Sequence, residues 1–331
     1  MPIPVLRRTQ ESGTEPQALR PQPPVPEEWQ HTYVSITGRN GEGEEIPLTG
    51  FQSGAWPSIV IQPGATGLDM PPFEIHADDS PNLDGSIYRG NRAGAREILL
   101  PVFIYGIDRK TLKEFKRKLA AALNPRNGYC VLSFTEGDGR PRRLRVFYRG
   151  GMEGSEDTGS SGFRWVSYGV QLTALDPWFF GDTDVIPSWD VGTSKPFLGP
   201  KFFPLTLGKG DVATSTLTVE NPGDIEAWPV WTLTGPLRSF KFTGPDKTSW
   251  GIKENVGGPD ALATGRTLTV DCRPGYKTLV DDKGKNYFPD LDASPSLWAV
   301  PAGESIVKTN LVAGSGTASV SMRLTPRYAS Y

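Results

Sequence analysis

The sequence predicts a mainly β protein with two domains, the first of which holds one α-helix. Its 331 residues exceed the roughly 250–300 at which a single core usually stops growing. Its 38 Gly and 31 Pro, with 37% hydrophobic residues, suit a turn-rich β protein better than a helical bundle. Short runs with a period of two recur between turn residues, whereas a helical period is confined to the segment before Asn124-Pro125.

Residues 1–31 are rich in Pro, Gln and charge. Such a segment cannot bury enough apolar surface to fold alone, so it is expected to be an extended arm or tail. Two interpretations stay open, a free end and an arm that drapes over a neighbouring subunit. Residues 1–29 lack an apolar core flanked by basic residues, so no secretory signal is expected. No window approaches the roughly 18 apolar residues of a membrane span, so no membrane partner is expected.

The first domain is expected over residues 32–181. Strands over residues 33–37 and 58–62 open it, and the Pro-punctuated residues 64–84 predict a long loop or extended excursion. Residues 96–106 are apolar at both alternating sets of positions. This pattern predicts a strand buried on both sides, with Pro101 at an edge or a bulge.

A single helix is expected after this strand. Asp108 is the predicted N-cap, and Asn124-Pro125 ends the helix. Basic residues fill one side of the segment, and the apolar residues recur at helical spacing on the other. The predicted core face consists of Leu112, Phe115, Leu119, Ala122 and Leu123.

Hairpin strands complete the first domain. Residues 128–134 and 142–149 are expected to pair across the turn residues 136–139. A further strand is expected over residues 164–175, where apolar residues alternate with Ser167, Gln171 and Thr173. One face of that strand is then buried, and the face with these three side chains is wet or lies in an interface.

Residues 182–213, with four prolines and scattered aromatic residues, are expected to form an ordered linker. A second, all-β domain is expected over residues 214–331, and short strands at its spacing indicate a sandwich or jelly roll. Its predicted strands are residues 215–220, 228–234, 237–242, 266–272, 277–280, 297–300, 305–312 and 318–324.

The sequence offers little for catalysis. Its two histidines, His31 and His76, fall outside the predicted strands and helix, where nothing would hold them against a nucleophile. Acidic pairs such as Asp281-Asp282 lie in turns, where solvated aspartates are the ordinary interpretation. A glycosidase built from two distant carboxylates stays open as a minor alternative. The prediction is that the protein is not an enzyme and has no catalytic residues.

The two cysteines, Cys130 and Cys272, lie in apolar runs of different predicted domains and are expected to be free, buried thiols. Two cysteines and two histidines do not make an ordinary zinc site. No metal-binding or cofactor-binding residue is therefore predicted, and no cofactor is expected.

A basic cluster lies on the first-domain hairpin. It consists of Arg140, Arg142, Arg143, Arg145 and Arg149, and alternation places the last three on one face. A net charge of -2 argues against a protein whose whole surface grips nucleic acid. Three interpretations stay open: a solvated strand face, a salt-bridge surface between subunits, and a local patch that faces nucleic acid.

Tryptophans of the second domain could offer stacking platforms for sugars, although a Trp in a sandwich is more often a core residue. Those concerned are Trp228, Trp231, Trp250 and Trp298. Glycan binding by this domain is kept as the alternative function.

The order of these features resembles the distal tail protein family of long-tailed, non-contractile bacteriophages. The resemblance is carried by the Asp84-Gly85 stretch with Arg89 and Arg96, the basic helix, the Asp138-Gly139-Arg140 turn and Asp176-Pro177-Trp178. In the second half it is carried by residues 216–224, Trp228-Pro229, Gly235-Pro236 and Pro326-Arg327-Tyr328. It covers the chain apart from the N-terminal arm.

The resemblance implies a structural virion protein at the tip of a phage tail, assembled in the host cytoplasm. The first domain would be a β-sandwich belt that forms a sixfold ring, and the second a galectin-like or sandwich domain that projects outward. The implied partners are further copies of the chain, the tail tube protein, and spike, fibre or baseplate proteins, with DNA passing through the ring. The predicted subunit contacts are Arg140, Arg143, Arg145, Arg149, Ser167, Gln171 and Thr173.

Overall fold

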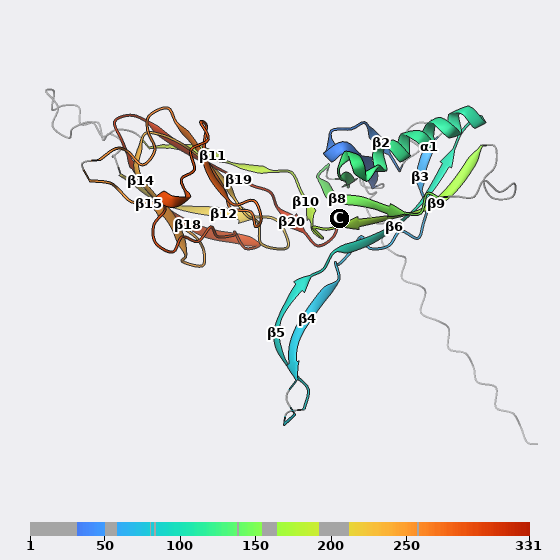
Figure 1. The fold of residues 1–331 in the computed structure, drawn as a ribbon, viewed down its shortest axis with the longest axis horizontal. Coiled ribbons are helices and arrows are strands. Elements are labelled where there is room, and N and C mark those ends of the chain that lie inside the picture. The colour runs from blue at the N-terminus through green and yellow to red at the C-terminus, as the bar shows by residue number, and fades with distance from the viewer. Residues whose placement is uncertain are drawn as a thin grey trace, which may run out of the picture.

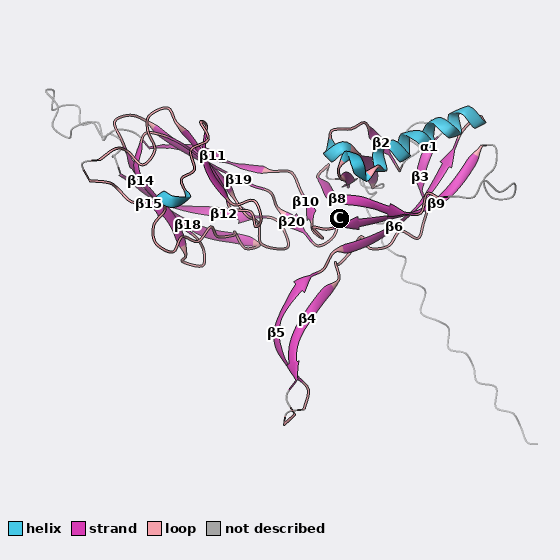
Figure 2. Cartoon of the chain, viewed as in Figure 1, coloured by secondary structure: helices cyan, strands magenta, loops and turns pink. Residues whose placement is uncertain are grey.

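The protein was analysed as a computed structural model that describes residues 32–49, 58–79, 81–82, 84–137, 139–153, 164–191, 212–256 and 258–331. Two β-rich bodies lie side by side, and a long hairpin projects away from the first of them (Figure 1). Strands dominate both bodies, with one long helix on the first (Figure 2). The predicted arm, residues 1–31, lies outside the described residues. None of the helices in the described part is long and apolar enough to cross a membrane.

The first domain is built on one antiparallel sheet in the order β2-β1-β7-β8-β9-β6-β3. Its strands are β1 (Tyr33–Thr37), β2 (Glu45–Pro47), β3 (Ser58–Ile61), β6 (Arg96–Tyr105), β7 (Cys130–Thr135), β8 (Pro141–Gly150) and β9 (Trp165–Ala174). Two short 3-10 turns, η2 (Arg39–Gly41) and η4 (Pro125–Asn127), flank this core. The strands expected from the alternating pattern are therefore confirmed, with small shifts at their ends.

Strand β6 buries one face rather than the two that its sequence suggested. Ile98, Leu100, Val102 and Ile104 are buried, whereas Leu99 is 37% exposed. The helix covers only one side of the sheet at β6, so the second apolar face remains open. Pro101 has no N–H to donate to a neighbouring strand. Beside it the chain that follows β3 bulges away from β6 between Gln62 and Thr66, which suits a residue without this donor.

Helix α1 (Arg109–Leu123) packs against β6 and matches the predicted segment. The Asp108 carboxylate accepts hydrogen bonds from the Thr111 N–H at 2.7 Å and its hydroxyl at 2.8 Å. These bonds lower the pKa of Asp108 because they favour its ionised form. Leu112, Leu119 and Leu123 are the buried residues on its core face.

Strands β4 (Phe73–Asp79) and β5 (Ser86–Ala93) form the projecting hairpin. The sequence suggested a long loop or an extended excursion over residues 64–84, and residues 73–79 form a strand of a projecting hairpin rather than a loop. The two strands pair only with each other, outside the main sheet. Their side chains are mostly exposed, so no hydrophobic core marked them in the sequence.

The second domain is a β-sandwich, as predicted. One sheet has the order β11-β19-β13-β16-β17 and the other β12-β18-β14-β15. The strands are β11 (Asp184–Val191), β12 (Val212–Asn221), β13 (Val230–Thr234), β14 (Leu237–Thr243), β15 (Ser249–Ile252), β16 (Thr267–Asp271), β17 (Thr278–Asp281), β18 (Gly303–Ala313) and β19 (Ala318–Leu324), with the turn η5 (Phe288–Asp290). Residues 297–300, expected as a strand, contribute only an isolated bridge from Val300 to Ala227.

The domain boundary differs from the predicted linker at residues 182–213. Strand β11 pairs with β19, so residues 184–191 belong to the second domain's sheet. The alternating pattern of β11 is interrupted by Pro187 and by a register shift between Ile186 and Trp189, which hid the strand in the sequence. Residues 192–211 lie outside the described part of the chain.

The C-terminal tail returns from the second domain to the first. Strand β20 (Arg327–Tyr328) pairs with β10 (Phe179–Phe180), and β10 in turn pairs with β8. Tyr328 is buried in the first domain's core, and Tyr331 stacks on Phe134 with ring centroids 4.3 Å apart. The two domains are thus joined twice, through β10–β11 and through the tail.

Arg96 ties several of these segments together. It is 1% exposed, and its guanidinium donates to the carbonyls of Gly67, Asp69, Pro177 and Ala329. Its guanidinium carbon also lies 5.0 Å from the centroid of the Phe179 ring. Gly67 has φ +81°, and a Cβ there would come within 2.0 Å of the Glu97 carbonyl oxygen, so only glycine allows this approach.

We expect Arg96→Met to lower the free energy of unfolding of the first domain by about 3 kcal/mol or more, because four carbonyls, buried or partly buried at these bonds, lose their donor. Hydrogen exchange at Tyr328 and Ala329 should rise as the tail loosens. Chemical denaturation and hydrogen exchange measure the two effects. Arg89→Met, at an exposed ion pair on the hairpin, is the control and should cost less than about 1 kcal/mol. Equal losses for the two variants would contradict the role of Arg96.

Candidate functional site

Within the described residues no group of three or more His, Cys, Asp and Glu side chains could hold a metal. Both cysteines are free and buried, as predicted. Burial raises the pKa of Cys130 to about 11 and that of Cys272 to about 12, so neither is an activated nucleophile near neutral pH. His76 lies on the exposed strand β4, and His31 lies outside the described part.

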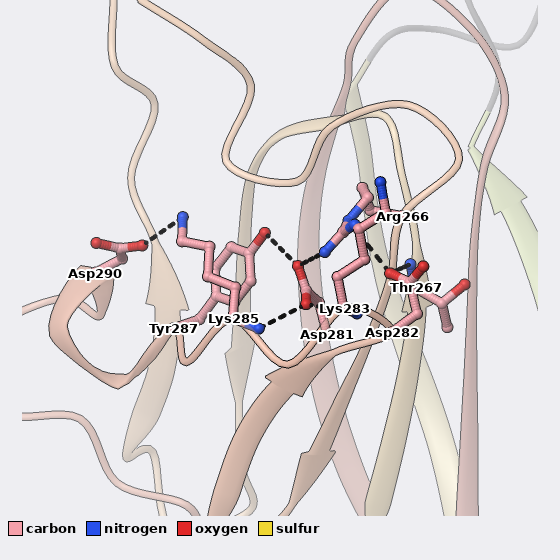
Figure 3. A network of polar contacts seen from close by, with 8 residues as sticks. All are labelled: Arg266, Thr267, Asp281, Asp282, Lys283, Lys285, Tyr287 and Asp290. Carbon is pink, nitrogen blue, oxygen red and sulfur yellow. Dashed lines mark hydrogen bonds and ion pairs between the residues drawn. The ribbon is translucent and has the colours of Figure 1, made fainter.

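The acidic pair Asp281-Asp282 serves the fold of the second domain. Burial of Asp281 opposes its ionisation, but the Arg266 guanidinium and the N–H groups of Lys283 and Lys285 outweigh it and lower its pKa to about 2. Tyr287 also donates to Asp281 at 3.3 Å (Figure 3). A carboxylate with this many donors holds the turn after β17 in place, and its oxygens are occupied.

The β4–β5 hairpin has one apolar and one charged face. Residues paired across a hairpin share a face, and the register pairs Phe73 with Ala93, Ile75 with Asn91 and Ala77 with Tyr88. A bulge between His76 and Ala77 brings Tyr88 onto the side of Ile75. Consistent with this, the Asn91 amide donates to the Tyr88 hydroxyl at 2.5 Å. The apolar face is open, since Ile75 is 71% and Tyr88 60% exposed.

The opposite face of the hairpin is held by ion pairs. Arg92 lies 2.6 Å from Glu74, its cross-strand partner, and Arg89 lies 2.6 Å from Asp78. Hydrogen bonding with Arg92 and its positive charge lower the pKa of Glu74. Both pairs are exposed, so they add little stability to the hairpin. An isolated two-stranded hairpin is marginally stable in water, which makes the apolar face a candidate contact surface.

A second open surface lies on the main sheet, on the faces of β6 and β9 turned away from the buried core. Here Phe103 is paired with Ser167, Leu99 with Gln171 and Glu97 with Thr173. Trp165 stacks on Phe103 with centroids 5.8 Å apart. We call this surface the β6–β9 face. The predicted contact residues Ser167 and Gln171 are exposed on it, whereas Thr173 is buried and its hydroxyl has no hydrogen-bond partner in the described part.

The structure divides the predicted arginine cluster. Arg143 is paired with Asp182 of its own chain at 2.6 Å. The Arg145 guanidinium lies 4.9 Å from the centre of the Phe180 ring. Arg149 lies at a register shift between Tyr148 and Gly150, which interrupts the alternation that grouped it with the other two. Arg140 precedes β8 and has interactions of its own.

A groove of about 560 Å³ opens between the domains, a feature that the sequence analysis did not identify. We call it the interdomain groove. Its walls are the outer side of β13, β16 and β19 and the edge of the first domain at β8 and β10. Aromatic rings and arginines line it, chiefly Arg145, Trp178, Phe180, Trp228, Tyr276, Arg323 and Arg327. The groove exists only because the tail folds back, which sequence patterns do not reveal.

The hairpin, in contrast, left a signal in the sequence. Phe73, Ile75 and Ala77 follow a period of two, and Ile87 and Tyr88 mark the returning strand. Pro71-Pro72 and Pro81 flank the first run and favoured a loop. The pattern was too short and too polar to outweigh them.

Comparisons with known proteins place these surfaces in context. Residues 61–160 match the family model described as phage tail protein RIFT-related domain. The fold is similar to the Dit protein of phage SPP1, described as a paradigm of the hub adsorption apparatus in phages that infect Gram-positive bacteria, with TM-score 0.58 and 14% identity over 89% of this chain and 98% of that one. It is also similar to a chain of the phage P2 baseplate in its activated conformation with calcium, with TM-score 0.51 and 8% identity over 91% and 100%. No curated protein matches the chain in sequence.

The family match gives the class first: residues 61–160, which include the hairpin, α1 and strands β6, β7 and β8, resemble a phage tail domain. The full two-domain fold is, more particularly, similar to that of the SPP1 Dit protein, in agreement with the resemblance to distal tail proteins. At 14% and 8% identity, these two matches show a similarity of fold.

The Asp281 network has a pH signature. The pKa of the Asp281 carboxyl is about 2 in the folded chain, below the ordinary 3.8. The ionised carboxylate therefore stabilises the folded second domain fully above about pH 4, and this stabilisation is lost as the pH falls toward 2. Asp281→Asn should lower the Tm of the second domain at pH 6 by several degrees, and the difference from the parent chain should shrink at pH 2. Calorimetry across this range makes the measurement. Asp290→Asn, at the exposed pair with Lys285, should follow the parent chain, and a pH-independent deficit for Asp281→Asn would contradict the assignment.

Proposed function

We propose that the chain forms a ring of six copies at the distal end of a phage tail, where it joins the tail tube to baseplate, spike or fibre proteins. The relatives that share its fold belong to a hub and a baseplate. In such a ring the first domain would form the belt around a lumen through which DNA passes. The second domain would point outward toward the other partners.

The projecting hairpin is the observation that carries this proposal. It places Phe73, Ile75 and Tyr88 on one face, outside both cores of its own chain. The Phe73 ring, at the base, lies 6.2 Å from that of Trp178, and Ile75 and Tyr88 are the more open side chains. Full burial of a large apolar side chain is worth about 1.5–3 kcal/mol, so covering this face with a neighbour gives a substantial gain. The charged face, with its two ion pairs, can stay in water.

The β6–β9 face is the surface we propose for receiving the hairpin of a neighbour. It exposes Leu99 and Trp165, each 37% exposed, beside Ser167 and Gln171. The hairpin and this face are different surfaces of one chain, so the contact is head-to-tail. Repeated head-to-tail contacts close into a ring when the rotation between neighbours allows it. The two polar residues predicted as subunit contacts would then lie beneath the neighbour's hairpin.

Glycan binding by the second domain, the alternative, finds less support. Trp231, Trp250 and Trp298 are buried in the sandwich core, where they cannot stack on a sugar. Trp228 alone among the four candidates is partly exposed, at the interdomain groove.

Ile75→Asp should weaken self-association about tenfold or more, because a carboxylate would be buried in the contact. The monomer should remain folded, since Ile75 touches neither core. Ile87→Asp is the matched control: Ile87 pairs with Asp78 on the charged face, and its replacement should leave assembly unchanged. Sedimentation velocity over a concentration series measures both. Equal association of the two variants would remove the apolar face from the interface.

A further inference from the structure

The interdomain groove has a preformed aromatic wall. The Arg327 guanidinium carbon lies 5.8 Å from the ring centre of Trp178 and 5.0 Å from that of Trp228, so one cation spans both rings. Tyr276 adds a ring that is 67% exposed at the rim. Partly exposed rings of this kind are surfaces on which apolar and aromatic side chains pack.

Arg327 also fixes the two domains against each other at the groove. Its guanidinium donates to the Asp176 carboxylate of the first domain at 3.2 Å and to the Glu226 carbonyl of the second at 3.4 Å. The Asp224 N–H donates to the Arg327 carbonyl at 2.9 Å, and the Asp224 carboxylate accepts from the Ala329 N–H at 2.9 Å. The walls of the groove are therefore held in place before a ligand arrives, which lowers the entropy that binding costs.

The acids of the groove are already engaged. Arg273 binds the Asp271 carboxylate through contacts of 2.6–3.1 Å, and Arg327 binds Asp176. Burial raises the pKa of Asp271, but the hydrogen bonds from Arg273 outweigh it and lower the pKa overall, with a smaller contribution from the charge of Arg323. Both carboxylates are thus paired within the chain, and neither is free to bind a ligand.

Two guanidiniums of the groove have no such partner. Arg145 lies on the first-domain wall and Arg323 on the second-domain wall, and both residues are exposed. Neither makes an ion pair with a described residue, and the Arg145 guanidinium lies over the Phe180 ring. The groove therefore presents donors and rings, and the ligand that fits it supplies carboxylates and carbonyls as acceptors.

This inventory favours a protein segment over a glycan or a nucleic acid. Sugar hydroxyls both donate and accept, but the carboxylates of the groove are engaged, and the Thr183 and Thr325 hydroxyls bond to each other at 2.9 Å. Nucleic-acid sites carry a larger basic excess than two free guanidiniums. Trp, Tyr and Arg are, in contrast, the residues in which binding energy concentrates at protein interfaces.

We propose that the interdomain groove binds an extended, acidic segment of a partner protein, one that carries aromatic or proline side chains beside its carboxylates. The apolar side chains would pack on Trp178, Trp228 and Tyr276, and the carboxylates would pair with Arg145 and Arg323. This use of Arg145 replaces the subunit contact that the sequence suggested for it. That the partner belongs to a tail tip rests on the proposed function, whereas the acidic preference of the groove does not depend on the ring.

Selection from a library of random dodecapeptides against the full chain tests the proposal. The Ile75→Asp background keeps the result independent of ring formation. The enriched peptides should carry several Asp or Glu residues together with aromatic residues or prolines. Arg145→Glu with Arg323→Glu should weaken their binding at least about tenfold in Kd, measured by fluorescence anisotropy, because like charges would then meet. A library that yields no acidic peptides, or peptides whose binding ignores this reversal, would overturn the proposal.

Arg126→Glu with Lys241→Glu is the matched control. It makes the same change in net charge at two exposed residues outside the groove, one in each domain. This variant should bind the enriched peptides as the Ile75→Asp chain does, and circular dichroism checks that both double variants keep the fold. An equal loss of binding in the two would reduce the effect to net charge and contradict a site in the groove.

Oligothymidine and an array of neutral and acidic glycans test the other ligand classes on the same chain. Neither should bind at the groove. Binding of either one that is lost on the Arg145→Glu and Arg323→Glu reversal would assign the groove to that class and overturn the proposal. All these measurements are made on the monomer, so their failure would leave the ring untouched, and a failure of the ring would leave them valid.

Discussion

The buried guanidinium of Arg96 is the interaction on which the rest of this structure depends. It stands at the first position of β6, directly after the hairpin, and it donates to carbonyls from three separate segments. Burial lowers the pKa of Arg96, and the negative charge of Asp69 partly offsets this shift. The surrounding groups thus help to keep the guanidinium in its charged form. Removing it would release the hairpin base, the approach to β10 and the C-terminal tail together.

The architecture follows from that anchor. Because the tail is held at Ala329, β20 can pair with β10, and Arg327 is positioned between Trp178 and Trp228. The interdomain groove is therefore a product of the tail rather than of either domain alone. At the other end, the fixed hairpin base allows β4 and β5 to extend away from the body, with Ile75 and Tyr88 exposed on their apolar face. Open contact surfaces of this kind suit the structural role that we propose for the chain.

The sequence predicted local structure well where a hydrophobic core enforced a period, as in α1, β9 and the sandwich strands. It failed where tertiary contacts decide. Strand β11 was hidden by Pro187, and β6 was expected to be covered on both faces because apolar residues such as Leu99 and Phe103 do not tell a core from an interface. The arginines show the same limit. Their alternation suggested one shared surface, yet Arg143 has an intrachain partner and Arg149 lies at a bulge. The groove joins residues up to 182 positions apart, from Arg145 to Arg327, and no local pattern reports such a meeting.

In the function that we propose, this chain assembles as a ring through its first domain. The most direct test is the mass of the purified chain by light scattering, with negative-stain images of the same peak and of the chain mixed with purified tail tube. The account predicts sixfold rings with lobes pointing outward, alone or at the ends of tubes. A chain that stays monomeric in both samples, without decorating the tube ends, would contradict it.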